Sequence, residues 1–78
     1  MMKQYKGFKI HAYQTADYLY KYSVSRKGFY DKSVITFCEP ALAMEECMRE
    51  IDGGLFDELY SQFVETNHGD ERNSLEIV

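Results

Sequence analysis

The residues of this chain best suited to nucleophilic or acid–base chemistry are two histidines and two cysteines, His11, His68, Cys38 and Cys47. A catalytic triad needs a nucleophile, a base and an orienting group within hydrogen-bond reach. His11 falls on the exposed side of a predicted strand, whereas Cys47 falls on the apolar side of a predicted helix, so a dyad would require opposite sides of the fold to meet. We therefore expect no catalytic residues and a non-enzymatic protein. The cysteines lack a C-x-x-C spacing, which favours reduced thiols over a disulfide, although pairing stays open.

Metal and cofactor sites are not predicted either. A zinc site needs three or four closely spaced ligands, and the Cys and His residues show no spacing such as H-x-x-x-H. A phosphate cradle needs glycines before a helix that continues with Lys, Ser or Thr. Here the acidic residues Asp57 and Glu58 follow Gly53-Gly54 and would repel a phosphate. We expect no metal and no cofactor.

Tyrosine and lysine form the pattern with the most functional content. Aromatic rings on an open sheet can stack bases, and neighbouring lysines can neutralise phosphates. Tyrosine is equally suited to protein interfaces, and a solvated sheet face with cross-strand Tyr–Lys pairs needs no partner at all. These three interpretations stay open for the candidate sheet-face residues, which are Tyr5, Lys9, Tyr13, Lys21, Tyr30 and Lys32.

Acidic residues dominate the second half of the chain. Residues 1–38 carry seven Lys or Arg against two Asp, and residues 39–78 carry two Arg against eleven Asp or Glu, for a net charge of −4. Carboxylates on consecutive helical turns are spaced not far from phosphates along a nucleic-acid backbone. An acidic helical face could therefore occupy a basic site on a partner, although an ordinary solvated face is the alternative. The residues expected to form this face are Glu45, Glu46, Glu50, Asp57 and Glu58.

Period-two alternation predicts the strands that position the Tyr/Lys residues. It extends over residues 5–13, 18–26 and 29–38. Lys27-Gly28 predicts a tight turn between the second and third strands. The alternation breaks at Asp31-Lys32-Ser33, where we expect a bulge. Sequential strands with short turns predict an antiparallel meander.

Two helices are predicted after Pro40, which suits the first turn of a helix. The first covers residues 41–51 and ends at Gly53-Gly54, and the second covers residues 55–66 and ends near Asn67-His68-Gly69. Ala41, Met44, Cys47 or Met48, and Ile51 form the apolar stripe of the first helix. The side chains expected to share one core are Ile10, Val24, Ile35, Phe37, Met44, Met48 and Ile51.

The order of these elements predicts a two-layer α+β domain. A three-stranded antiparallel meander, covered by one or two C-terminal helices, would occupy residues 1–66, and residues 67–78 would form an acidic, flexible tail. The apolar stripe of residues 55–64 either completes the core or forms a homodimer interface. No apolar run is long enough to cross a membrane and no signal-peptide pattern occurs, so we expect a cytoplasmic protein without membrane contact.

The chain resembles a group of small stand-alone bacterial and phage-borne β-β-β-α domains. The resemblance covers residues 5–53 and consists of a Tyr-x-Gly-aromatic opening strand, a meander, an aromatic strand before a helix, and an Ile-Asp-Gly helix exit. It implies a fold and no function, because these residue types serve turns and core positions. The matching residues are Tyr5, Gly7, Phe8, Ile10, Val24, Phe37, Ala41, Ile51, Asp52 and Gly53.

Small size, many tyrosines and uneven charge together favour a protein that acts by macromolecular contact. The expected partner is a protein with a basic or nucleic-acid-handling surface. Phage- or mobile-element-encoded inhibitors, including anti-CRISPR proteins, are often short, acidic and without catalytic residues, so one hypothesis is an inhibitor of that kind. The alternative is a nucleic-acid-binding module that uses the Tyr/Lys sheet face.

Overall fold

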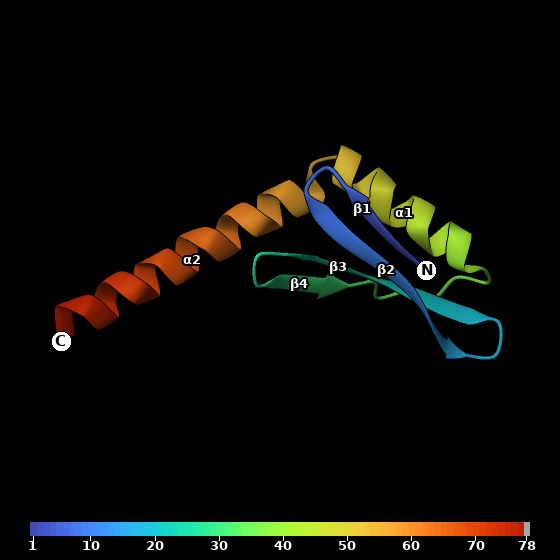
Figure 1. The fold of residues 1–78 in the computed structure, drawn as a ribbon, viewed down its shortest axis with the longest axis horizontal. Helices are drawn as coiled ribbons and strands as arrows, with labels where there is room; N and C mark the ends of the chain where they lie inside the picture. Colours follow the sequence, from blue (N-terminus) through green and yellow to red (C-terminus); the bar gives the residue numbers. More distant parts are fainter. Residues whose placement is uncertain (78) are drawn as a thin grey trace.

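The fold consists of one antiparallel sheet and two helices. The computed structural model describes the backbone of residues 1–77 and the side chains of residues 1–66. The strands are β1 (Met2–Tyr5), β2 (Phe8–Ala16), β3 (Leu19–Arg26) and β4 (Phe29–Lys32), and the helices are α1 (Pro40–Asp52) and α2 (Leu55–Ile77). The sheet order is β1-β2-β3-β4, with α1 across one face and α2 extending away from the sheet (Figure 1). The predicted α+β class is confirmed, but the sheet has four strands where three were expected.

The additional strand arises from a turn inside the predicted strand 5–13. Lys6 and Gly7 both have positive φ, 48° and 86°, and Tyr5 pairs with Phe8 across them. Positive φ at both central residues defines the type I′ turn that suits two-residue hairpins. The chain therefore reverses at Lys6-Gly7, and Met2–Tyr5 forms β1 as a separate edge strand.

The predicted third strand, 29–38, is shorter than expected because the chain leaves the sheet after Lys32. Ser33 turns inward and is only 4% exposed, and its hydroxyl accepts a hydrogen bond from the Tyr22 backbone N–H at 3.2 Å. The chain returns at Phe37, which forms an isolated bridge with Tyr20. Ile35 lies in the intervening loop and is 62% exposed, so its predicted place in the core is wrong.

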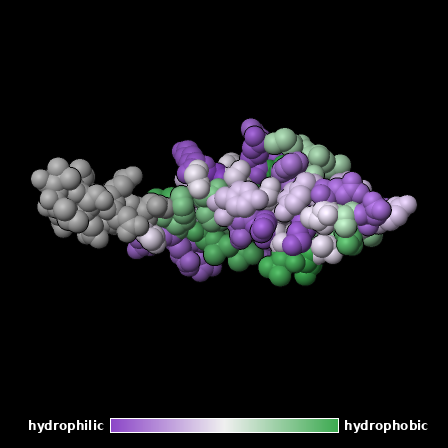
Figure 2. Space-filling view, turned by 90° about the horizontal axis from the view of Figure 1, so that it is seen from below, coloured by the Kyte–Doolittle hydropathy of each residue, from purple (hydrophilic) through white to green (hydrophobic). Residues whose placement is uncertain are grey.

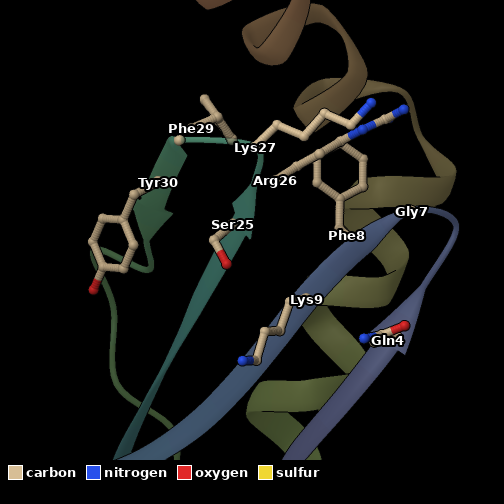
Figure 3. A pocket seen from close by; sticks show the side chains of 10 residues that line it. Gln4, Gly7, Phe8, Lys9, Ser25, Arg26, Lys27, Phe29 and Tyr30 are labelled. Carbon is tan, nitrogen blue, oxygen red and sulfur yellow. The ribbon is translucent and has the colours of Figure 1, made fainter.

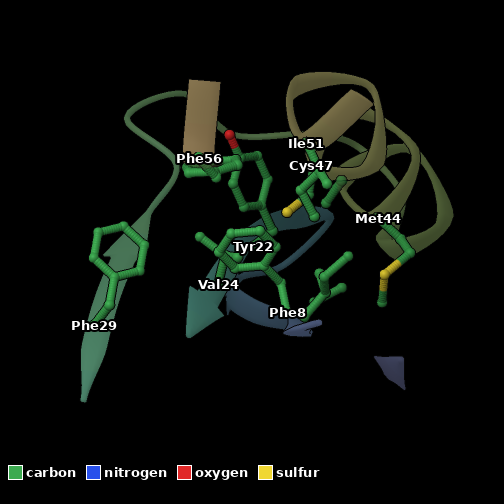
Figure 4. Close-up of a cluster of buried hydrophobic side chains, with 11 residues drawn as sticks. Phe8, Tyr22, Val24, Phe29, Met44, Cys47, Ile51 and Phe56 are labelled. Atoms are coloured by element: carbon green, nitrogen blue, oxygen red, sulfur yellow. The ribbon is translucent and has the colours of Figure 1, made fainter. Parts of the chain in front are cut away.

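The core lies between the sheet and the helices (Figure 4). Among the residues expected there, Ile10, Val24, Met44 and Ile51 are buried, and Phe37 and Met48 are partly buried against them. On α1, Ala43 is buried in place of the predicted Ala41, which is exposed. The full set of buried apolar residues is Phe8, Ile10, Ala12, Tyr22, Val24, Phe29, Ala43, Met44, Cys47, Ile51 and Phe56.

Helix α2 both completes the core and extends beyond it. Phe56 is 2% exposed, and Tyr60 and Phe63 stack edge-on against Phe29, with ring centroids 6.0 and 5.8 Å apart. The helix continues past the end predicted at Asn67-His68-Gly69, as far as Ile77. The side chains of residues 67–78 are outside the described residues, and the flexibility expected of this segment stays a prediction. Over the described part of the chain, neither helix has the length and hydropathy needed to cross a membrane.

Candidate functional site

The face of the sheet turned away from α1 brings together most of the predicted Tyr/Lys residues. Phe8 and Ile10 of β2 face the core, so the alternating residues Lys9 and Tyr13 face the other side. Cross-strand partners share a face, and the register adds residues of β3, β4 and β1 to it. We call this surface the open face, and its residues are Met2, Gln4, Lys9, His11, Tyr13, Lys21, Ser23, Ser25, Tyr30 and Lys32.

Tyr5 does not belong to the open face, contrary to the prediction. The turn at Lys6-Gly7 pairs Tyr5 with Phe8, whose side chain is in the core, so both residues are on the helix-covered side. The Tyr5 hydroxyl donates to the Asp52 carboxylate at the end of α1, at 2.9 and 3.0 Å from its two oxygens. Tyr5 thus joins the β1–β2 turn to α1 and is not available as a stacking platform.

The open face is positively charged although the chain carries a net charge of −4. It contains three lysines, Lys9, Lys21 and Lys32, and no Asp or Glu. Among the described residues, none of these lysines is in an ion pair. Asp31 is the nearest acid along β4, and it pairs with the buried Val24 on the other side of the sheet. The surface therefore attracts anions locally, since potentials follow the local charge distribution.

Aromatic rings accompany these lysines. Tyr30 is 62% exposed, and within the described part of the chain its ring contacts no other ring. Tyr13 is half-buried, and its ring centroid is 5.7 Å from that of His11. Figure 2 shows the molecule from below the view of Figure 1, and on this side purple hydrophilic, pale and green hydrophobic side chains are intermixed. Rings and ammonium groups in alternation are the groups that bind an unstacked, phosphate-bearing strand.

A hollow of about 620 Å³ lies where the open face meets the two Lys-Gly turns. Of the ten residues around it, only Lys9 and Tyr30 were among the predicted site residues; Gln4, Ser25 and Lys27 are among those that were not. Gln4 precedes the first predicted strand, and Ser25 has no charge or ring to mark it. The recurrence of Lys-Gly-Phe at residues 6–8 and 27–29 was the available signal, because equal turns at one end of a sheet border a common surface.

The predicted acidic residues of α1 do not share one face. Glu45 lines a groove with Met2 and Lys3 beside β1. Glu46 and Glu50 lie on the flank of α1 that faces Tyr22. Burial is the main cause that raises the pKa of Tyr22 to about 12, with smaller electrostatic contributions from Cys47, Glu50, Asp31 and Glu46.

Arg49 further interrupts the acidic surface of α1. Its Nη1 atom donates to the Glu46 carboxylate at 3.2 Å, which neutralises one of the three glutamates. At the start of α2, Asp57 and Glu58 are exposed, and the charge of Asp57 helps to raise the pKa of Lys6. The predicted acidic set is therefore distributed over several flanks of the helical layer.

Lys6, Tyr5 and Asp52 form the tightest polar cluster of the described residues. The Lys6 ammonium forms a short ion pair with the Asp52 carboxylate, and the Tyr5 hydroxyl donates to the same carboxylate. Hydrogen bonds from Lys6 and then Tyr5 hold the pKa of Asp52 below its ordinary value of 3.8. The hydrogen bond to Asp52 raises the pKa of Tyr5 and also that of Lys6. Lys6 and Asp52 are exposed and Tyr5 is partly buried against the core, so we interpret the cluster as a clasp between the β1–β2 turn and the end of α1.

The cysteines and histidines do not form a catalytic arrangement within the described residues. Cys47 is buried in the core and its thiol pKa is raised to about 12, mainly by that burial, whereas His11 lies on the open face across the sheet. Cys38 is an exposed free thiol, and Cys47 is also free, so they are not paired. The described part of the chain contains no group of three potential metal ligands. The side chain of His68 is outside the described residues.

Comparison of the chain with protein-family models, with curated proteins and with solved structures found no match.

Proposed function

We propose that this chain is a binding module whose open face binds single-stranded nucleic acid. The observation that carries the proposal is the coincidence of exposed or half-buried lysines and tyrosines on an open face that holds no carboxylate. Lysines that contact phosphates displace condensed counterions, which drives association with any nucleic acid. Exposed rings favour a single strand, because only unstacked bases can stack on them.

The spacing of side chains on the open face supports the same ligand class. Residues of one face recur about 7 Å apart along a strand, and neighbouring strands are about 4.8 Å apart. Lys9, Tyr13 and Lys21 therefore form a regular array over β2 and β3, with Tyr30 and Lys32 extending it onto β4. An array of this kind can contact successive nucleotides of an extended strand.

The acidic helical layer on the opposite side is consistent with this orientation. Seven of its described acids occupy α1 and α2, namely Glu45, Glu46, Glu50, Asp52, Asp57, Glu58 and Glu65. Their negative potential disfavours nucleic acid on the helical side. The segregation of charge would thus direct a strand to one side of the sheet.

The test is a titration of a fluorescein-labelled single-stranded oligonucleotide with the purified chain at low salt, monitored by anisotropy. Replacement of Lys9 and Lys21 by Glu should abolish the binding, and replacement of both by Gln should weaken it by a smaller factor. Tyr13→Ala should weaken binding by about fivefold or more, the loss expected for one stacked base. If the wild-type chain gives no anisotropy change with any DNA or RNA sequence, the proposal is wrong.

A second candidate function is the protein-binding role expected from the acidic residues. Glu45 and Glu58 favour it, because both are exposed and neither is in an ion pair with a described residue. These carboxylates would dock the helical layer on a basic surface, as an inhibitor of a nucleic-acid-handling protein would. Replacement of Glu45 and Glu58 by Lys should then abolish capture of a basic partner from lysate treated with nuclease, and unchanged capture would reject this candidate.

The homodimer expected through residues 55–64 stays a prediction. Most of that apolar stripe packs against the core, and Leu55 and Val64 are its exposed members at 42% and 43%. Sedimentation equilibrium at several concentrations would test it.

A further inference from the structure

A row of four residues crosses the open face beside the two Lys-Gly turns. The register pairs Gln4 with Lys9, Lys9 with Ser25, and Ser25 with Tyr30, so each strand contributes one residue to the row. Figure 3 shows Lys9 and Ser25 side by side on β2 and β3, with the Tyr30 ring on the next strand. Together these residues present an amide, an ammonium group, a hydroxyl and a ring in a fixed order.

The row lines the hollow of about 620 Å³. This volume is within the range of small-molecule sites, which is about 300–1,000 Å³. The polar ends of Gln4, Lys9 and Ser25 have no hydrogen-bond partner among the described residues, so they are available to a ligand. The lining contains no acid and includes two more cations, Arg26 and Lys27.

The rim of the hollow is held in place by stacking. The Arg26 guanidinium is 4.6 Å from the ring centroid of Tyr60 and 5.4 Å from that of Phe8. These contacts fix Arg26 between β2 and α2, and they lie on the helix-covered side. The hollow is therefore bordered by a rigid corner of the fold, which reduces the entropic cost of ordering a site there.

We infer that this row binds one nucleotide unit, with the base on the Tyr30 ring and the phosphate on the Lys9 ammonium. Tyr30 and Lys9 are two strands apart, about 10 Å, which is comparable with the reach from a base to its 5′-phosphate. Ser25 lies between them, where the sugar or the base edge would be. The inference rests on the proposed function and deepens it: the row is the position at which a bound strand is held most specifically.

The ligand could be a nucleotide within a strand or a free nucleoside monophosphate, and both present the same groups. The test uses ¹⁵N-labelled chain titrated with adenosine monophosphate, with adenosine and with inorganic phosphate. We expect saturable shifts at Gln4, Lys9, Ser25 and Tyr30 with the monophosphate, and at least tenfold weaker binding of adenosine and of phosphate. Equal binding of phosphate and monophosphate, or shifts centred elsewhere, would overturn the inference.

A matched pair of variants separates this inference from the proposed function. Tyr30→Ala should weaken binding of the monophosphate by about tenfold, whereas Tyr18→Ala, at an exposed ring in the β2–β3 turn outside the open face, should leave it unchanged. If an oligonucleotide binds but the monophosphate does not, the strand-binding function stands and the single-nucleotide site is wrong. If the monophosphate binds at the row and no oligonucleotide does, the site stands alone and the strand-binding function is wrong.

Discussion

Asp52 shows how one residue connects the parts of the fold. It is the last residue of α1, and its carboxylate accepts hydrogen bonds from Tyr5 and Lys6 at the β1–β2 turn. The sequence identified Asp52 only as part of a helix exit, because its partners precede it by 46 and 47 positions. A contact between residues so far apart in the sequence leaves no local pattern from which it could be predicted.

The clasp at Asp52 predicts a pH dependence of stability. Because the folded chain holds the pKa of Asp52 below 3.8, the ionised carboxylate stabilises the fold at pH values above 3.8. This contribution decreases as the pH falls below 3.8, and it is lost once the pH is below the lowered pKa that Asp52 has in the folded chain. The urea midpoint should therefore decrease over this acid range, and Asp52→Asn should flatten the decrease. An unchanged acid profile in Asp52→Asn would show that the clasp contributes nothing.

The backbone conformations of the two glycines between the helices predict that only one of them tolerates alanine. Gly54 has φ of +89° with nothing within 4 Å of an added Cβ, so Gly54→Ala should cost about 1–2 kcal/mol of folding free energy through backbone strain alone. Gly53 has an ordinary φ of −76°, so Gly53→Ala should change the folding free energy by less than about 0.5 kcal/mol. Urea denaturation of both variants measures the difference, and equal effects would contradict the assigned backbone conformations.

Cys47 and Cys38 predict a difference in thiol reactivity. Burial raises the pKa of the Cys47 thiol to about 12, whereas Cys38 is exposed. At pH 8 a thiol reagent should rapidly modify only Cys38 in the folded chain, and both cysteines in urea. Rapid modification of Cys47 in the folded chain would contradict its place in the core.

At the scale of the elements, alternation predicted strands well and one turn poorly. Strand 18–26 is nearly the observed β3, and Lys27-Gly28 is the observed turn after it. The same dipeptide at Lys6-Gly7 is not predicted as a turn, because residues 5–13 show an apparently continuous alternation. The two-residue turn pairs Tyr5 with Phe8 and so inverts the parity of the alternation. Because β1 has only four residues, periodicity alone does not reveal this inversion.

The end of β4 could not be predicted for a different reason. Val34 and Ile35 have strong strand propensity, yet both are exposed, because the Ser33 side chain forms a hydrogen bond with β3 and the chain leaves the sheet there.

Ile51→Ala should cost about 2–5 kcal/mol of folding free energy, since Ile51 is 2% exposed between α1 and the sheet. The matched variant Ile35→Ala should cost less than about 0.5 kcal/mol. A similar loss of folding free energy in both variants would contradict the exposed position of Ile35.

At the scale of the whole molecule, the sequence predicted the charge asymmetry but not its geometry. The alternation in β2 and β3 correctly placed Lys9, Tyr13 and Lys21 on one face. The acidic set was wrongly treated as one surface, because its members differ in helical phase and Arg49 lies among them. Within one strand, alternate residues lie on the same face, so the sequence alone predicts which residues lie together. On a helix, the exposed residues depend on which side of the helix packs against the sheet.

The central claim is that nucleic acid binds the open face, and the salt dependence of two charge-reversal variants tests it most directly. Lys9 is on the open face, whereas Lys3 pairs with the buried Ile10 and is on the opposite side of the sheet. Oligonucleotide affinity should be measured over a range of salt concentrations for the wild-type chain, Lys9→Glu and Lys3→Glu. We predict that Lys9→Glu reduces the slope of log affinity against log salt by about 0.7 or more, the value for one phosphate contact. Lys3→Glu should leave the slope unchanged, and an equal reduction in both variants would contradict binding at the open face.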